Sequence, residues 1–211
     1  MSDAVVVGDD GRARCPWGLA PPEYATYHDE EWGRPVVDDV RLFEKLCLEG
    51  FQAGLSWLTI LRKREGFRAA FAGFDPEVVA RFDAADVERL LGDAGIVRHR
   101  GKIEAAIGNA RATLDLRAER GSLAALVWAH EPEPAAHPPR TLGEVPATSP
   151  ASVALSRTLR ARGFRFVGPT TVHAFLQAMG LVNEHLEGCW VREEVERARA
   201  RVRRPSGAGP G

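Results

Sequence analysis

The sequence has few cysteines and no long hydrophobic run. Three scattered cysteines, Cys15, Cys47 and Cys189, are too few for the disulfide framework of a small secreted protein. No apolar run approaches the ~20 residues that a membrane-spanning helix needs. Residues Met1 to Arg14 lack the apolar stretch and basic flank of a secretory signal. From these absences we expect a cytoplasmic protein that does not engage a membrane.

The sequence also lacks an excess of charge of one sign. The formal net charge of the 211 residues is −1 at pH 7, which argues against binding of nucleic acid through bulk positive charge. A local basic surface is still compatible with this value, although such residues also occur on ordinary solvated helix faces. The candidates for a basic surface are Arg98, Arg100, Lys102, Arg160, Arg162 and Arg165.

Helical periodicity dominates the chain, and we find no strand-like alternation. Apolar residues recur three and four positions apart after Asp38 or Asp39, either of which is a plausible N-cap. Asp75-Pro76 is typical of an N-cap followed by proline at the first helical position. We therefore predict an all-α fold, whose further helices cover residues 57–71, 83–91, 101–116, 152–162 and 170–179.

The predicted domain lies between two atypical ends. We expect residues 1–14 to be a disordered extension and residues 15–35 to be irregular. We expect residues 15–190 to form the domain, in two helical lobes without a clear linker. Six prolines in residues 131–150 predict a long surface loop, and residues 191–211 predict a charged, partly disordered tail.

The segment GFRFVGPTT lies between two predicted helices. Gly163 and Gly168 permit close backbone approach, and we expect Phe166 and Val167 to anchor the turn in the core. Pro169 has no amide hydrogen, but the first position of a helix does not need one. The other free amides at the start of this helix can hold a phosphate. These are the physical requirements of a helix–hairpin–helix, although an ordinary αα-hairpin also fits the pattern.

Two cysteines and two histidines lie near opposite ends of the chain. His185 and Cys189 are four residues apart and would share one face of a helical turn. Cys15 and His28 supply two further ligands of the types found in structural zinc sites. The long separation of the two pairs makes this spacing weak evidence on its own. Cys47 lies on the apolar face of its predicted helix, and we interpret it as a core residue.

One carboxylate, Glu49, lies among aromatic residues. Such a group is typical of a pocket for a flat cation, because each ring contributes about 0.5–2 kcal/mol of cation–π attraction and the carboxylate adds charge-assisted hydrogen bonds. Taken singly, each ring also fits core packing, and Glu49 also fits an exposed helix end. The aromatic residues are Tyr24, Tyr27, Trp32 and Trp57.

Together these segments resemble the DNA-3-methyladenine glycosylase I family. The resemblance is carried, in order from Cys15 to Cys189, by CPW, YHDEEWG, LFEKLCLEGFQAGLSW, FDP, DAGIVRHRGKIEAAIGNA, RGFRFVGPTT and FLQAMGLVNEHLEGC. Only residues 1–14 and the segment after Cys189 depart from the family's pattern.

The resemblance implies an all-α helix–hairpin–helix DNA glycosylase fold, with the hairpin over residues 152–180. It implies one structural Zn²⁺ per chain, bound by Cys15, His28, His185 and Cys189. It implies a lesion pocket in which Glu49 is the key carboxylate and the base is surrounded by Tyr24, Tyr27, Trp32 and Trp57. It implies DNA contacts by Gln52, Gly54, Leu55, Gly163, Val167, Gly168 and Thr170.

The implied activity is hydrolysis of the N-glycosidic bond of 3-methyladenine in alkylated double-stranded DNA, by a monomer that flips the base out of the helix. The methylated base is cationic and needs no protonation to leave, so binding and electrostatics can suffice. No aspartate occurs between Gly163 and Cys189, where other members of the superfamily place one, and Glu184 is a secondary candidate there. Thr170 and Thr171 stand where a lyase would need a lysine.

Two alternatives stay open at this point. The first is a glycosylase of other specificity, such as one that removes 7-methylguanine, which excision assays on defined lesions would distinguish. The second is a non-catalytic zinc-containing DNA-binding domain. Such a domain needs no carboxylate among aromatic rings, so Glu49 together with Trp57 argues against it.

Overall fold

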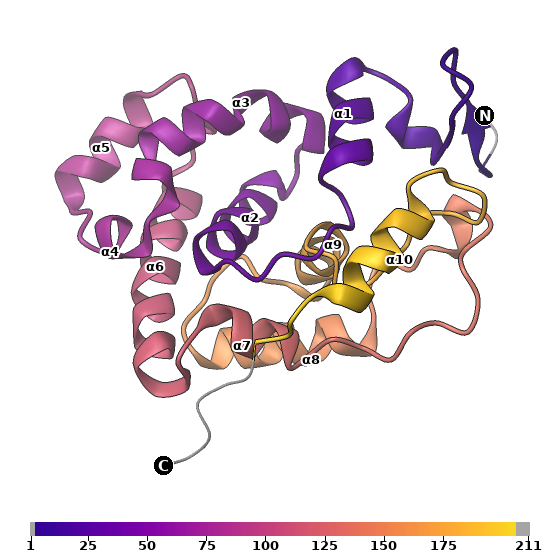
Figure 1. Ribbon diagram of the computed structural model, residues 1–211. Coiled ribbons are helices and arrows are strands. Elements are labelled where there is room, and N and C mark those ends of the chain that lie inside the picture. The colour runs from indigo at the N-terminus through magenta and orange to yellow at the C-terminus, as the bar shows by residue number, and fades with distance from the viewer. Residues whose placement is uncertain (1–2, 206–211) are drawn as a thin grey trace.

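Helices make up nearly all of the regular structure in the computed structural model, which describes residues 3–205 (Figure 1). The α-helices are α1 (Pro22–Glu30), α2 (Asp39–Gln52), α3 (Trp57–Ala70), α4 (Pro76–Val79), α5 (Ala84–Gly92), α6 (Arg100–Arg120), α7 (Leu123–Trp128), α8 (Pro150–Ala161), α9 (Pro169–Ala178) and α10 (Arg192–Arg201). The shorter elements are the strands β1 (Val6–Val7) and β2 (Ala13–Arg14) and the 3₁₀ helices η1 (Pro16–Gly18), η2 (Ala72–Phe74) and η3 (Leu142–Glu144). The predicted helical class is confirmed.

Side-chain caps fix the start of several helices. The Asp38 carboxylate accepts a hydrogen bond from the Arg41 amide at 2.9 Å, which begins α2. Ser56 caps α3 in the same way, and Asp75 caps α4 with Pro76 at the first helical position. These caps satisfy amides that have no partner within the helix. They confirm the predicted starts of α2 and α4 and the predicted interruption between α2 and α3.

Residues 3–35 differ from the prediction, and residues 1–2, which we also predicted to be disordered, lie outside the described part of the chain. Strands β1 and β2 pair antiparallel where we expected disorder, because Arg14 is buried against Asp29 at 2.8 Å and so ties the hairpin to the helical domain. The stretch that we expected to be irregular contains α1, which begins at Pro22. We predicted disorder from composition, and composition does not reveal that Arg14 pairs with Asp29 on a different element.

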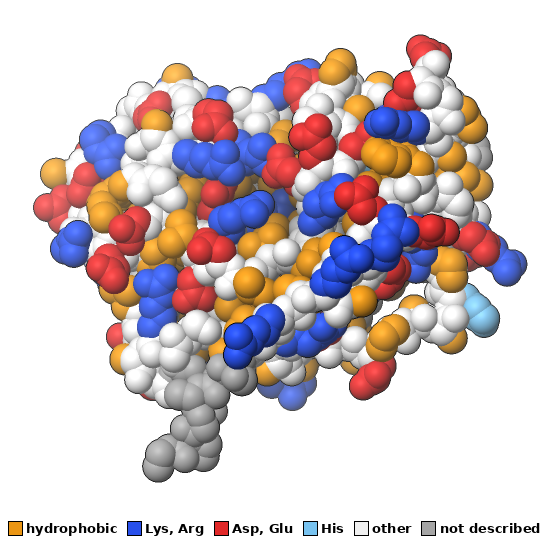
Figure 2. All heavy atoms as spheres, viewed as in Figure 1, with side chains coloured by type: hydrophobic (Ala, Val, Ile, Leu, Met, Phe, Trp, Pro, Cys, Tyr) orange, Lys and Arg blue, Asp and Glu red, His pale blue; other side chains and the backbone are white. Residues whose placement is uncertain are grey.

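The segment after Val191 forms the charged helix α10, whose inner face carries Val195 and Arg199. The Arg199 guanidinium is buried and donates to the Gly180 and Leu181 carbonyls at 2.9 Å each. Figure 2 shows basic side chains over α10 and acidic and basic side chains interspersed over the rest of that face. Residues 206–211, which we predicted to be disordered, lie outside the described part of the chain.

Across residues 3–205, we find no helix with the length and apolar character needed to cross a membrane.

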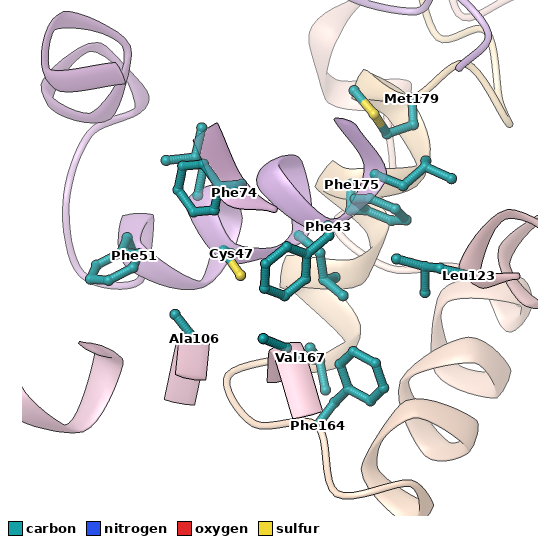
Figure 3. Close-up of a cluster of buried hydrophobic side chains, with 14 of the residues drawn as sticks. Phe43, Cys47, Phe51, Phe74, Ala106, Leu123, Phe164, Val167, Phe175 and Met179 are labelled. Carbon is teal, nitrogen blue, oxygen red and sulfur yellow. The ribbon is translucent and has the colours of Figure 1, made fainter. Parts of the chain in front are cut away.

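Helix α2 is the centre of the hydrophobic core, and it packs against α3, α6, α7 and α9. Residues Leu42 to Phe51 are buried without interruption, and Figure 3 shows Phe43 and Cys47 facing side chains of α9 and of the turn before it. Full burial of one such side chain contributes about 1.5–3 kcal/mol. Cys47 is buried in this cluster, which confirms its interpretation as a core residue. The C-terminal end of α2 is therefore held rigidly.

Candidate functional site

A cavity of about 340 Å³ lies beside the C-terminal end of α2, within the size range of small-molecule sites. It is bounded mainly by α1, α2, α3 and α9, together with residues of the loop before α8. The lining residues are Trp17, Tyr24, Tyr27, Trp32, Glu49, Gln52, Trp57, Leu142, Val145, Ala174, Gln177 and Glu184. All five residues that the sequence grouped into a base pocket are among them.

The aromatic rings of the cavity support one another by edge-on contacts. The Trp17 ring lies 5.0 Å from the Trp32 ring and 6.0 Å from the Tyr24 ring, centroid to centroid. The Tyr24 hydroxyl accepts a hydrogen bond from the Leu58 amide at 2.9 Å, which ties α1 to the start of α3. Trp17 was missing from the predicted pocket, although its place in the CPW segment was a signal for it.

Glu49 is only 5 % exposed, which excludes its interpretation as a helix-end surface charge. Lys45, one helical turn earlier, places its Nζ atom 3.0 Å from the Glu49 carboxylate. The same ammonium donates to the Tyr27 hydroxyl at 2.6 Å and lies 3.4 Å from the centroid of the Trp57 ring. Burial lowers the pKa of Lys45, and the Glu49 carboxylate opposes this shift. The i, i+4 spacing was a signal for this pair that the sequence prediction did not use.

Polar groups lie along the wall of the cavity and directly behind it. The Trp57 indole Nε1 is buried and has no hydrogen-bond partner among the described residues, and an unpaired buried donor costs about 1–3 kcal/mol. Glu184 is held by a hydrogen bond from the Gln177 amide, and its carboxylate lies 3.3 Å from Nε2 of the buried His173. A ligand in this cavity would therefore meet two carboxylates and several aromatic rings.

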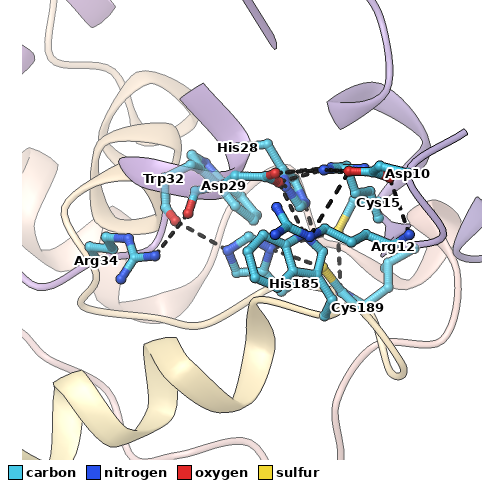
Figure 4. Close-up of polar contacts among 12 residues, drawn as sticks. Asp10, Arg12, Cys15, His28, Asp29, Trp32, Arg34, His185 and Cys189 are labelled. Carbon is cyan, nitrogen blue, oxygen red and sulfur yellow. Dashed lines mark hydrogen bonds and ion pairs between the residues drawn. The ribbon is translucent and has the colours of Figure 1, made fainter. Parts of the chain in front are cut away.

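Four buried side chains converge beside this cavity (Figure 4). One donor atom from each of Cys15, His28, His185 and Cys189 lies within 4.8 Å of the others. The Cys189 Sγ atom lies 3.5 Å from His28 Nε2 and 3.6 Å from His185 Nδ1, and Cys15 Sγ lies 3.8 Å from His185 Nδ1. With metal–donor distances of about 2.0–2.3 Å, the donors of a tetrahedral zinc site are about 3.3–3.8 Å apart. The predicted residues are thus brought together in a geometry that suits a metal ion.

The second nitrogen of each histidine is held in place. His28 Nδ1 lies 2.8 Å from the Asp29 carboxylate, and His185 Nε2 lies 3.1 Å from the Trp32 carbonyl oxygen. Such contacts are typical of metal-binding histidines, because they fix the ring and its tautomer. Hydrogen bonding from Cys15 and from the two histidines lowers the pKa of the Cys189 thiol, which favours the thiolate that binds a metal.

The turn between α8 and α9 leaves the start of α9 uncovered. Gly168 is the N-cap, so no side chain caps the first amides of α9. Gly163 has a φ of +85°, and Thr170 is exposed. Val167 is buried as expected, so only its backbone can meet a ligand. Our expectation for Phe166 is wrong: its φ of +57° turns the ring outward, and the residue is 38 % exposed.

The second exposed segment is the loop from Ala53 to Ser56, between α2 and α3. Gln52 lines the cavity and Leu55 is 42 % exposed, so this loop leads from the cavity to the surface. Lys102 does not belong to a basic surface as we expected. Its buried ammonium donates to the carbonyls of Phe51 and Ala53 at 2.9 and 2.6 Å and so caps the C-terminal end of α2.

The other predicted basic residues are partly neutralised. Arg100 pairs with Glu88 at 2.6 Å, and Arg162 pairs with Glu119 at 2.7 Å. Arg98, Arg160 and Arg165 are exposed, so a DNA-binding surface would combine these side chains with backbone amides and the loop between α2 and α3.

Comparison with known proteins gives consistent matches over most of the chain. The family model described as methyladenine glycosylase matches residues 17–193. The chain is 52 % identical over 179 residues to DNA-3-methyladenine glycosylase 1 of Escherichia coli, covering 83 % of this chain and 95 % of that protein. It is 45 % identical over 177 residues to DNA-3-methyladenine glycosylase of Haemophilus influenzae, covering 83 % and 96 %.

The structure is similar to solved structures as well. One of them is a variant of 3-methyladenine DNA glycosylase I in complex with 3-methyladenine. It superposes with a TM-score of 0.81 at 38 % sequence identity, covering 85 % of this chain and 97 % of that chain. The family model covers every residue that lines the cavity, together with His28, His185 and Cys189, whereas Cys15 lies before it.

Proposed function

This chain belongs to the methyladenine glycosylase family, and on that premise we propose that it is a monofunctional DNA repair glycosylase that hydrolyses the N-glycosidic bond of 3-methyladenine in alkylated DNA. The observation that carries the proposal is a buried carboxylate, Glu49, in a cavity walled by aromatic rings. Rings and a carboxylate suit a flat cation. Two relatives share the name of this activity, and a similar solved structure holds 3-methyladenine.

The proposed reaction begins when the damaged nucleotide leaves the base stack, at a cost of a few kcal/mol. The base then stacks against Trp57, with Tyr24, Tyr27 and Trp32 around it and the Glu49 carboxylate facing its positive charge. The Trp57 Nε1 atom is buried without a partner, and we propose that a shift of the indole on binding lets it donate to the base. The methylated base leaves without protonation. The protein's contribution is therefore to orient the base and to surround it with suitable charge while water attacks the sugar.

We propose that α8, the turn and α9 form a helix–hairpin–helix that binds the backbone of duplex DNA. The uncapped amides at the start of α9 can bind a phosphate without reading sequence. The contacts would come from Gly163, Gly168, Thr170 and the backbone of Val167. The exposed loop after Gln52, including Gly54 and Leu55, would enter the space that the flipped base leaves.

We further propose that Cys15, His28, His185 and Cys189 hold one structural Zn²⁺ per chain. Two thiolates and two imidazoles form a closed tetrahedral set, which leaves no position for substrate and gives the metal no step in the reaction. The ion would join the start of the domain to the segment before α10. A monomer contains the whole site, because all proposed pocket and metal ligands come from one chain.

The test is to incubate the purified protein with alkylated DNA and to identify the released bases by chromatography. The expected product is free 3-methyladenine, with no strand cleavage. Release of 7-methylguanine instead would indicate a glycosylase of other specificity. DNA binding without release of any base would indicate a non-catalytic zinc-containing DNA-binding domain.

A further inference from the structure

The ammonium of Lys45 lies behind the wall of the candidate pocket. Tyr27 and Trp57 line both the cavity of about 340 Å³ and a narrow cavity of about 30 Å³ next to it, so these two rings separate the two spaces. Lys45 lines only the narrow cavity and is 6 % exposed. Its Nζ atom contacts Tyr27, Trp57 and Glu49, which are three of the groups proposed to surround the base.

The other charged groups around the narrow cavity have partners of their own. Glu31 pairs with Arg64 at 2.6 Å, and Glu44 pairs with Arg68 at 2.8 Å. Arg41 also lines this space but is exposed to solvent. Among the described residues, Lys45 and Glu49 are therefore a buried lysine–carboxylate pair that directly adjoins the base pocket.

The position of Lys45 determines how a base can stack. Because its Nζ atom lies 3.4 Å from the Trp57 ring centroid on one face, a base can stack only on the other face. Van der Waals contact there adds about 3.5–4 Å, so the ammonium would lie about 7 Å from the base. At this distance in a protein interior, a unit charge changes equilibria and rates by a measurable factor.

We propose that Lys45 is an electrostatic positioning residue that speeds departure of the base at the expense of tight binding of the charged lesion. This inference rests on the proposed function. Glu49 alone would stabilise the cationic base in the ground state. Binding of this kind does not accelerate the reaction, because only interactions that strengthen in the transition state do so.

Lys45 can affect the rate because positive charge moves from the base to the sugar during the reaction. When the C1′–N9 bond breaks, its electron pair stays on N9 and the cationic base becomes neutral. The sugar C1′ gains the positive charge, water adds to it, and the water's proton passes to solvent. A fixed positive charge behind the base therefore disfavours the bound cation more than the departing neutral base, and so it lowers the barrier between them.

The test measures the single-turnover cleavage rate and the affinity for DNA that contains one 3-methyladenine. Lys45→Met keeps the length of the side chain but removes its charge, and it should slow cleavage about tenfold while the lesion is bound equally or more tightly. Lys45→Arg keeps the charge and should retain most of the rate. Arg62→Met removes an exposed α3 charge that pairs with Glu23 at the surface, and it should change neither quantity.

A cleavage rate of Lys45→Met equal to that of the wild type would overturn the inference, as would a slower rate matched by an equal loss of affinity. If Lys45→Met does not fold, Lys45→Gln, which also removes the charge but keeps a polar end group, supplies the same comparison of cleavage rate and affinity, with the same expected and contradicting results. Failure of the proposed function itself would appear separately, as absence of base release by the wild-type protein.

Discussion

At the scale of single residues, the structure changes the interpretation of Glu49 and its surroundings. The sequence grouped it with the correct aromatic residues, and all of them line one cavity. It could not show that Glu49 is buried, or that Lys45 is its partner at 3.0 Å. Sequence spacing indicates that two side chains share a helix face, but whether that face is exposed depends on the helices packed against it.

The first prediction concerns the charge of Glu49. Glu49→Gln keeps the size of the side chain but removes its charge, so it should weaken binding of the charged lesion and reduce 3-methyladenine release at limiting DNA concentration about 10–100-fold, as expected for the loss of a hydrogen bond to a charged group. Because the substitution leaves Lys45 buried without a counter-ion, thermal stability should also fall. The double variant Glu49→Gln, Lys45→Met should regain stability but not activity. Release at the wild-type rate by Glu49→Gln would restrict Glu49 to a structural role.

The second prediction concerns the unpaired indole of Trp57. Trp57→Phe keeps a ring for stacking but removes the Nε1 donor, which has no partner in the free protein. We expect a loss of activity of about 2–10-fold, corresponding to one neutral hydrogen bond, with unchanged or higher thermal stability. Trp57→Ala should lose more, because stacking is removed as well. Equal activity of Trp57→Phe and wild type would mean that the indole nitrogen does not contact the base.

At the scale of elements, helices with strong local signals were predictable, and elements held by distant partners were not. Helices α2 and α4 begin at predicted caps, because capping is decided within four residues. The hairpin of β1 and β2 depends on Arg14 reaching Asp29 on α1, and composition does not contain that contact. The prediction for Phe166 was wrong for a related reason: composition does not reveal its positive φ, and the side chain is exposed instead of buried.

The third prediction concerns the turn before α9. A Cβ atom at Gly168 would meet only the end of the Arg160 side chain, at 3.5 Å, which is ordinary contact. Gly168→Val should therefore fold but hinder a phosphate at the start of α9. Affinity for duplexes of any sequence should fall, and the slope of log affinity against log salt should decrease by about one phosphate contact. Gly108→Ala, on α6 with open space around it, is the matched control. Unchanged affinity and salt slope for Gly168→Val would remove this turn from the DNA interface.

At the scale of the whole molecule, the N-terminal hairpin and the segment before α10 lie together near the pocket (Figure 1). The Trp190 amide donates to the Ala13 carbonyl at 2.8 Å, and the Leu142 amide donates to the Asp3 carbonyl at 2.8 Å. Trp32 connects this region to the pocket, because its carbonyl orients His185 while its ring lines the cavity. From the sequence, the only sign that these two segments lie together was that Cys15, His28, His185 and Cys189 are all residue types that bind zinc.

The fourth prediction is that a metal ion maintains this convergence. The second hydrophobic cluster has only four buried members, Cys15, Leu186, Cys189 and Val191, two of which are among the proposed metal ligands. Its apolar packing alone is therefore small. The purified protein should therefore contain one zinc ion per chain. Cys189→Ala should lose the ion and unfold at a markedly lower temperature, because binding energy at a structural zinc site is also folding energy. Chelation of the wild-type protein should have the same effect.

Cys47→Ala provides the matched control for this prediction. Cys47 is also a buried cysteine, but it lies in the core on α2 and away from the four converging donors. The substitution should reduce stability modestly through lost packing and keep a full complement of zinc. Co²⁺ substitution adds a spectroscopic check, since thiolate ligation should produce a charge-transfer band in wild type and Cys47→Ala that is absent in Cys189→Ala. Full zinc occupancy in Cys189→Ala would contradict the assignment of the ligands, and the hydrogen bonds between the chain ends would then have to account for their convergence.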